Sequence, residues 1–160
     1  MLVHGDMLID LSHHIQPESV DLAIIDPPYG IGSKKLAHKA KNWKKSDEEW
    51  DQFETVQKQR EFYQRMLGVV WPLLKPSGSL FCFGSYHNIF QCGDILQTEL
   101  QGKLINSITW YKQNAMFSVT RSSLIESSES AIWVGKTKDF YFNYEASKSF
   151  NNGQQLRNVW

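Results

Sequence analysis

The stretch Val20-Asp21-Leu22-Ala23-Ile24-Ile25-Asp26-Pro27-Pro28-Tyr29 decides the fold of this chain of 160 residues. Its first six residues form an apolar run that is typical of a buried strand, and the run stops abruptly at Asp26. Two prolines then fix the backbone, and an aromatic ring follows them. We therefore expect an acceptor carboxylate, a fixed carbonyl and a ring to lie together at the carboxyl end of a strand, where open α/β sheets bind ligands.

This set of groups suits the exocyclic amino group of a nucleobase. That nitrogen is a poor nucleophile because its lone pair is delocalised into the ring, so a catalyst must hold both N–H groups in a geometry that frees the lone pair. The Asp26 carboxylate can accept one N–H and the Pro27 carbonyl the other. Tyr29 can stack on the base, worth about 1–3 kcal/mol. A plain Pro-Pro turn that Asp26 caps is the alternative interpretation of these residues.

The spacing of apolar residues predicts the other elements. We expect strands before Gly5 and over 79–83, 105–111, 130–134 and 139–142, and helices over 8–15, 62–73 and 86–100. Strands separated by helices predict a doubly wound α/β sheet. The later strands have no helical pattern between them and predict an antiparallel hairpin at its edge.

In several short motifs and in their order, the chain resembles the amino-terminal part of the amino-methylating DNA methyltransferases of the β arrangement. In that S-adenosylmethionine-dependent family a catalytic DPPY block precedes the cofactor block. The matching pieces are Gly5-Asp6, Asp26 to Tyr29, Glu49-Trp50-Asp51, Lys75 to Gly78, Ile108 to Lys112, and Glu129 with Trp133. The resemblance implies an incomplete doubly wound Rossmann-like sheet. Residues 1–143 would form the catalytic portion, and residues 144–160 the start of a truncated target-recognition segment.

The resemblance also implies roles for individual residues. Asp26, Pro27, Pro28 and Tyr29 would be catalytic, and Asp6, Asp26 and Pro27 would contact S-adenosyl-L-methionine. Asp6 fits the N-cap of a helix equally well. The implied reaction is methyl transfer to N6 of adenine in DNA. N4 of cytosine is the alternative, because both enzyme types use such a tetrapeptide, although Asp in its first position favours adenine.

One block of the family pattern is absent from the sequence. Family members carry a Pro-Phe-X-Gly-Ser-Gly type segment that holds the methionine end of the cofactor, and this sequence has none. We expect a truncated or split enzyme in which Val20–Ile25 is an exposed sheet edge. Such an edge pairs with a second chain that supplies the missing half, or with another copy. A catalytically inactive DNA-binding or regulatory remnant is the alternative function.

Charge is segregated although the formal net charge is zero. Lysines cluster directly after the DPPY block, and an acidic stretch follows them. We expect DNA phosphates to be bound by Lys34, Lys35, Lys39, Lys41 and Arg121. A solvated loop whose charges compensate one another is the alternative.

The remaining composition narrows the class of protein. No long apolar run suggests a membrane span or a secretory signal, so we expect a soluble cytoplasmic protein. Cys82 and Cys92 have neither metal-ligand nor disulfide-framework spacing, and we interpret both as reduced thiols of the core. The histidines lack partners at ligand spacing, so we expect no metal site.

Overall fold

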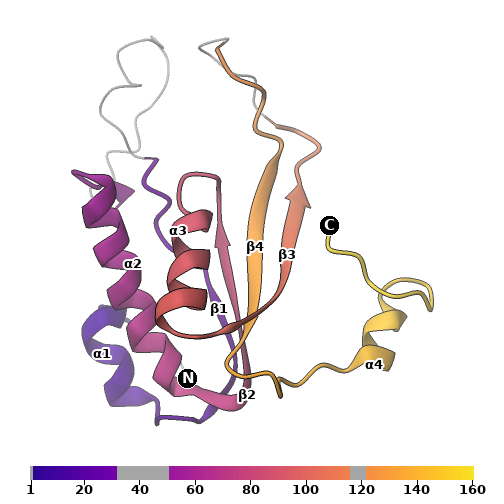
Figure 1. Ribbon diagram of the computed structural model, residues 1–160, viewed down its shortest axis with the longest axis horizontal. Helices are drawn as coiled ribbons and strands as arrows, with labels where there is room; N and C mark the ends of the chain where they lie inside the picture. Colours follow the sequence, from indigo (N-terminus) through magenta and orange to yellow (C-terminus); the bar gives the residue numbers. More distant parts are fainter. Residues whose placement is uncertain (1, 32–50, 116–121) are drawn as a thin grey trace.

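The computed structural model describes residues 2–31, 51–115 and 122–160 (Figure 1). The strands are β1 (Val20–Ile25), β2 (Leu74–Gly84), β3 (Lys103–Tyr111) and β4 (Ser128–Gly135). The helices are α1 (Met7–His14), α2 (Val56–Val70), α3 (Ile89–Asp94) and α4 (Tyr144–Ser149), with a 3₁₀ turn η2 (Trp71–Leu73) and a π-helical turn η3 (Ile95–Glu99).

The four strands form one sheet in the order β1-β2-β4-β3. β1 is parallel to β2, and Ile25 lies opposite Cys82. β4 is antiparallel to both of its neighbours. Where β2 begins, it passes so close to β1 that a side chain at Gly78 would come within 2.9 Å of the Val20 carbonyl oxygen. The predicted α/β sheet and its antiparallel edge hairpin are confirmed.

Helix α2 covers one face of the sheet because its apolar residues recur at helical spacing. The hydroxyl of Thr55 caps the helix by accepting a hydrogen bond from the Lys58 amide at 3.1 Å. Figure 1 shows α3 in front of the strands with α2 beside it, and α1 beside α2. The core between helices and sheet includes Tyr63, Met66, Leu67, Leu80, Cys82, Cys92, Ile95, Leu96, Ile132 and Val134. Both cysteines are buried and free, as predicted.

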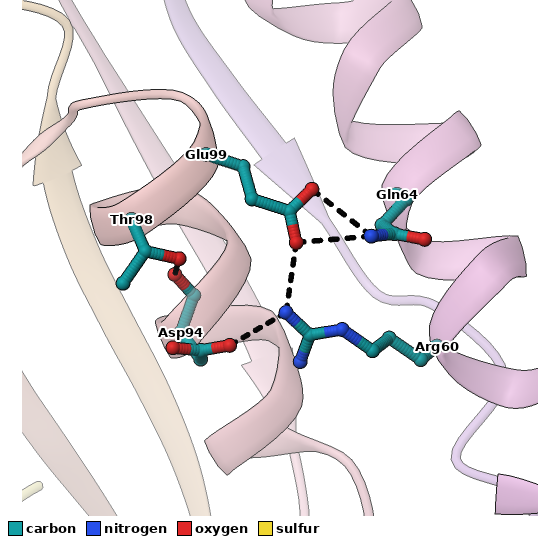
Figure 2. A network of polar contacts seen from close by, with 5 residues as sticks. All are labelled: Arg60, Gln64, Asp94, Thr98 and Glu99. Atoms are coloured by element: carbon teal, nitrogen blue, oxygen red, sulfur yellow. Dashed lines mark hydrogen bonds and ion pairs between the residues drawn. The ribbon is translucent and has the colours of Figure 1, made fainter. Parts of the chain in front are cut away.

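A polar network fastens α2 to the α3–η3 segment at the surface (Figure 2). The Arg60 guanidinium donates to Asp94 at 2.6 Å and to Glu99 at 2.7 Å. The Gln64 amide donates to both carboxylate oxygens of Glu99, and Thr98 donates to the Asp94 carbonyl. These contacts fix the lateral position of α2, whose buried face also reaches the DPPY segment.

The opposite face of the sheet is covered differently. Phe81 of β2 stacks on Trp133 of β4 with ring centroids 5.4 Å apart, and Phe140 and Phe142 pack on Trp133. Chain segments after β4 border a hollow of about 920 Å³ there. On β1 the side chains on this face are open, since Ile24 is 66% exposed. Among the described helices, α2 and α3 cover only the other face, so the doubly wound arrangement is incomplete, as expected.

The two edges of the sheet also differ. At the β3 edge the Thr109 amide donates to the Asn158 carbonyl and the Tyr111 amide to the Trp160 carbonyl, both at 2.8 Å. Residues 144–160 therefore contain α4 and a segment that lies beside β3, with a parallel bridge between Val159 and Thr109. At the opposite edge of the sheet, β1 pairs with β2 on one side and with no strand of the described ranges on its other side, so the predicted exposed edge is confirmed.

Two predicted strands are wrong. Residues 139–142 form no strand, because Phe140 and Phe142 turn toward Trp133 and only the Tyr141 amide bonds to β2, at the Ser77 carbonyl. Residues 2–4 form no strand either, since no described strand lies beside them. β2 begins at Leu74, earlier than predicted. No helix in the described ranges is long and apolar enough to span a membrane.

Candidate active site

The DPPY segment forms a corner directly after β1, at the carboxyl end of the strand. The Asp26 side chain is exposed to solvent, whereas Pro27 is buried. The Tyr29 hydroxyl donates to one Asp26 carboxylate oxygen, Oδ1, at 2.8 Å. The other oxygen, Oδ2, accepts no hydrogen bond from any residue that the structure describes. One carboxylate oxygen thus remains available to a ligand at the strand end.

Helix α2 supports this corner from beneath. The Tyr63 hydroxyl donates to the Pro28 carbonyl at 2.7 Å. The Gln59 side-chain amide donates to the Tyr29 carbonyl at 3.1 Å and to the Tyr63 hydroxyl at 2.9 Å. Tyr63 is fully buried and Gln59 is 8% exposed, so these hydrogen bonds are shielded from water. The backbone of the corner is therefore held by side chains from one neighbouring helix.

The chain leaves the corner through Gly30. Its amide donates to the buried Asp51 carboxylate at 2.7 Å, and its φ of +74° lies in the left-handed region. A Cβ at this position would come within 2.4 Å of the Gln59 amide nitrogen. Glycine is needed both for the backbone conformation and for the close approach of Gln59.

Burial governs the titration of the two tyrosines at the corner. It raises the pKa of Tyr29 well above its usual value, and the hydrogen bond to Asp26 raises it further. Burial likewise raises the pKa of Tyr63. Both hydroxyls therefore stay protonated and remain donors at neutral pH. Glu129 of β4, which forms an ion pair with Lys112, lies close enough to contribute to the raised pKa of Tyr29.

The structure brings together only some of the predicted site residues. Asp26, Pro27, Pro28 and Tyr29 lie together, as their adjacency requires. Asp6 caps α1 by accepting from the Leu8 amide at 2.9 Å, and among the described residues no hydrogen bond joins it to the corner. The predicted DNA-binding residues lie outside the described residues: Lys34, Lys35, Lys39, Lys41 and Arg121.

Of the supporting residues Gln59, Tyr63 and Asp51, sequence analysis named only Asp51, as part of a matching piece, and it did not predict the contact that Asp51 makes. A signal for two of them was present, because Gln59 and Tyr63 stand four residues apart on the face of α2 that also carries Met66 and Leu67. Polar groups on a core-facing stripe need buried hydrogen-bond partners. That pattern predicts a polar contact beneath the helix but does not identify its partner.

The hollow on the opposite face of the sheet is a separate feature. The residues that line it include Phe81, Trp133 and Leu156, but none of the DPPY residues. Within the described ranges no group of three histidine, cysteine, aspartate or glutamate side chains could hold a metal ion. The candidate site is thus the DPPY corner itself, which offers the Asp26 carboxylate as a hydrogen-bond acceptor at the end of β1.

Comparison with known proteins relates this geometry to a family. The family model N6_N4_Mtase, DNA methylase, matches residues 20–159. The type II methyltransferase M2.LlaDCHI of Lactococcus lactis subsp. cremoris is 32% identical over 164 aligned residues. That alignment covers 100% of this chain and 60% of the relative, so the chain spans less than two thirds of the relative's length.

Solved structures share the fold. The PvuII DNA methyltransferase (cytosine-N4-specific) matches with a TM-score of 0.68 at 18% identity, covering 98% of this chain and 54% of the other. The M1.HpyAVI-SAM complex matches with a TM-score of 0.52 at 25% identity, covering 88% of this chain and 57% of the other. The family match spans most of the sequence and includes the entire DPPY corner, and the chain belongs to the DNA methylase family.

Proposed function

We propose that this chain carries the catalytic portion of an enzyme that transfers a methyl group to the N6 amine of adenine in DNA. One observation carries the proposal: Asp26 has an exposed carboxylate with one unused oxygen, on a corner whose neighbouring carbonyls are held by α2. Membership of the DNA methylase family supports it. Asp in the first position of the tetrapeptide supports adenine over cytosine.

The corner would hold the amine by its two N–H groups. The Asp26 Oδ2 atom accepts one of them and the Pro27 carbonyl accepts the other. Among the described residues none donates to the Pro27 carbonyl, so both acceptors are available. Two acceptors on one side of the nitrogen draw it out of the plane of the base and free its lone pair for attack on the opposite side.

The chemical step is an in-line displacement at the methyl carbon. S-adenosyl-L-methionine, which the matched M1.HpyAVI complex contains, supplies an electrophilic methyl group on a sulfonium. The lone pair of the amine would form the N–C bond while the S–C bond breaks. The electron pair of the S–C bond would leave with the sulfur. Positive charge that develops on the nitrogen is stabilised by Asp26, and the displaced proton passes to that carboxylate or to water.

The described residues fit the methyl-transfer end of this cofactor. The Asp26 Oδ2 atom is an unpaired acceptor on an exposed residue, and the carbonyl of the buried Pro27 follows it in the chain, at the strand end where a sulfonium and an amine must meet. Asp6 is exposed and uses one carboxylate oxygen to cap α1, which leaves the other for a hydroxyl or amino group of the adenosine part. The methionine end requires the glycine-rich block that this sequence does not contain.

We infer that the polypeptide with that block adds a strand beside β1. β1 has no described strand on the side away from β2, and its side chains Leu22 and Ile24 on the open face of the sheet are 50% and 66% exposed. Because Ile24 is exposed, the substitution Ile24→Lys is expected to leave the chain folded while it places a charge on this surface. Sedimentation analysis is expected to show association with the complementing polypeptide for the unmodified chain and its loss for Ile24→Lys; unchanged association would contradict this inference.

The lysines after the corner are assigned to DNA phosphates as part of the same proposal. Replacing Lys34 and Lys35 with alanine is expected to reduce the slope of log affinity against log salt by about 0.9 for each phosphate that is no longer neutralised. Fluorescence anisotropy with a labelled duplex at several salt concentrations measures the slope. An unchanged slope would contradict the assignment.

Methyl transfer itself decides the function. The chain is incubated with DNA and S-adenosylmethionine that carries a tritiated methyl group. The same assay is then run on a fusion protein, in which this chain replaces the part of the Lactococcus relative that it matches and is joined to the rest of that relative. Chromatography of the digested DNA is expected to show N6-methyladenine from the fusion. N4-methylcytosine would instead assign the alternative base. Labelling of neither base, with DNA binding retained, would assign the chain as an inactive remnant.

A further inference from the structure

We propose that Tyr63 and Gln59 of α2 are positioning residues that set the direction of the Pro27 carbonyl by holding the two carbonyls after it. This inference rests on the proposed function of the corner and extends it to two side chains of another element. Neither touches the reacting atoms. Both act through the backbone of the segment that does.

The covalent geometry of the corner explains how this control works. The peptide plane with the Pro27 carbonyl and the plane with the Pro28 carbonyl are joined by two bonds of Pro28. The proline ring fixes φ, the rotation about one of them. Only ψ of Pro28, the rotation about the other bond, remains free. The hydrogen bond of 2.7 Å from the Tyr63 hydroxyl to the Pro28 carbonyl restrains this rotation. A restraint on one carbonyl is therefore transmitted to its neighbour.

The supporting side chains are themselves held in place. Gln59 uses its side-chain amide nitrogen twice, toward the Tyr29 carbonyl and toward the Tyr63 hydroxyl. Its side-chain oxygen accepts a longer contact of 3.5 Å from Gln91. The Tyr63 hydroxyl thus accepts from Gln59 and donates to Pro28, so its proton has one favoured direction. Such buried chains of hydrogen bonds orient their members more sharply than isolated bonds do.

Tyr63 also has a packing role, which must be separated from positioning. Its ring lies 6.0 Å from that of Phe53 and 5.8 Å from that of Phe62, between centroids. The substitution Tyr63→Phe keeps this ring packing and removes only the hydroxyl. Gln59→Leu removes the amide at similar size. Gln64→Leu is the matched control, because Gln64 lies on the same helix but bonds to Glu99 (Figure 2).

Kinetics of the fusion protein test the proposal first. Misdirected reacting groups lower the rate of the chemical step but not substrate affinity. Tyr63→Phe and Gln59→Leu are therefore expected to lower kcat about 10–100-fold with KM for DNA unchanged. Gln64→Leu is expected to leave both values unchanged. An equal fall in kcat for Gln64→Leu would assign the effect to general loss of stability and overturn the proposal.

Hydrogen exchange supplies a readout that does not require activity. The Gly30 amide, bonded to Asp51, reports on whether the corner opens. Its exchange, measured by NMR on the unfused chain, is expected to be faster in Tyr63→Phe and Gln59→Leu and unchanged in Gln64→Leu. Unchanged Gly30 exchange in both corner variants would overturn the proposal. Absence of methyl transfer by the unmodified fusion would refute the proposed function instead, and the exchange data would still decide the positioning role.

Discussion

The carboxyl end of β1 and the outer edge of the same strand differ in the partners that this chain provides for them. At the end, Tyr63, Gln59 and Asp51 bond to consecutive backbone groups of residues 28–30. Along the edge, Leu22 and Ile24 are exposed, and no described strand lies beside β1 on the side away from β2. The difference teaches that the chain builds the acceptor geometry from its own residues, while the surface beside it is suited to an added strand.

The largest expected effect comes from Asp26→Ala. Asp26 is exposed at the strand end, so the substitution should leave the fold intact while it removes one of the two acceptors for the amine. Removal of one such electrostatic interaction costs about 10²–10³-fold in kcat. The tritium-transfer assay on the fusion protein measures it, with circular dichroism as the control for folding. Activity within a few-fold of the unmodified protein would show that Asp26 is not catalytic.

The second prediction compares the two faces of the sheet through leucines on adjacent strands. Leu80 of β2 is fully buried beneath the helices, whereas Leu22 of β1 is 50% exposed on the open face. Leu80→Ala should lower the free energy of unfolding by about 2–5 kcal/mol through loss of burial and the cavity left behind. Leu22→Ala should change it by less than about 1 kcal/mol. Urea unfolding of both variants tests this, and equal losses would contradict the contrast between faces.

The third prediction uses the raised pKa of Tyr63. Above pH about 10 an unfolded tyrosine releases its proton, whereas buried Tyr63 keeps it, so the unfolded state binds fewer protons and the free energy of unfolding falls as pH rises. Below that pH both states hold the proton and the contribution is constant. Tyr63→Phe should flatten the decline above pH 10 by at most about 1.4 kcal/mol per pH unit. Denaturation between pH 9 and 11 measures the slope, and an unchanged slope would show that Tyr63 ionises freely.

The smallest effect is expected from Arg60→Ala. Arg60 links α2 to both Asp94 and Glu99 at the surface (Figure 2), on the side of the helix that faces the α3–η3 segment. We expect a slightly lower Tm at low salt, and a smaller difference at high salt because ions screen exposed pairs. Thermal melts at two salt concentrations check it. A salt-independent loss would indicate that packing of the Arg60 side chain, and not its charge, stabilises the contact.

The order of the elements was predictable because each depends on local pattern. The apolar run ending at Asp26 specified a strand and its turn, and residues 105–111 and 130–134 specified the hairpin that the structure contains. The strand at 139–142 was predicted wrongly because Phe140 and Phe142 alternate as in a strand. Their apolar partner is the Trp133 ring and not a neighbouring backbone.

The support of the corner could not be predicted in the same way. Gln59 and Tyr63 reach carbonyls that are 30 and 35 residues away in the sequence, and no local spacing specifies such contacts. The N-cap of α1 is the opposite case. Asp6 and Leu8 are two residues apart, so the capping role follows from local sequence and is confirmed. The cofactor role of Asp6 remains a prediction.

A structure of the fusion protein bound to DNA that contains its target adenine would test the catalytic role of the corner most directly. We predict an extruded adenine whose N6 atom lies about 2.7–3.2 Å from both the Asp26 Oδ2 atom and the Pro27 carbonyl oxygen. Tyr63 and Gln59 should keep their bonds to the corner in that complex. A target base bound elsewhere, or an amine that contacts neither acceptor, would contradict the proposed role of the DPPY segment.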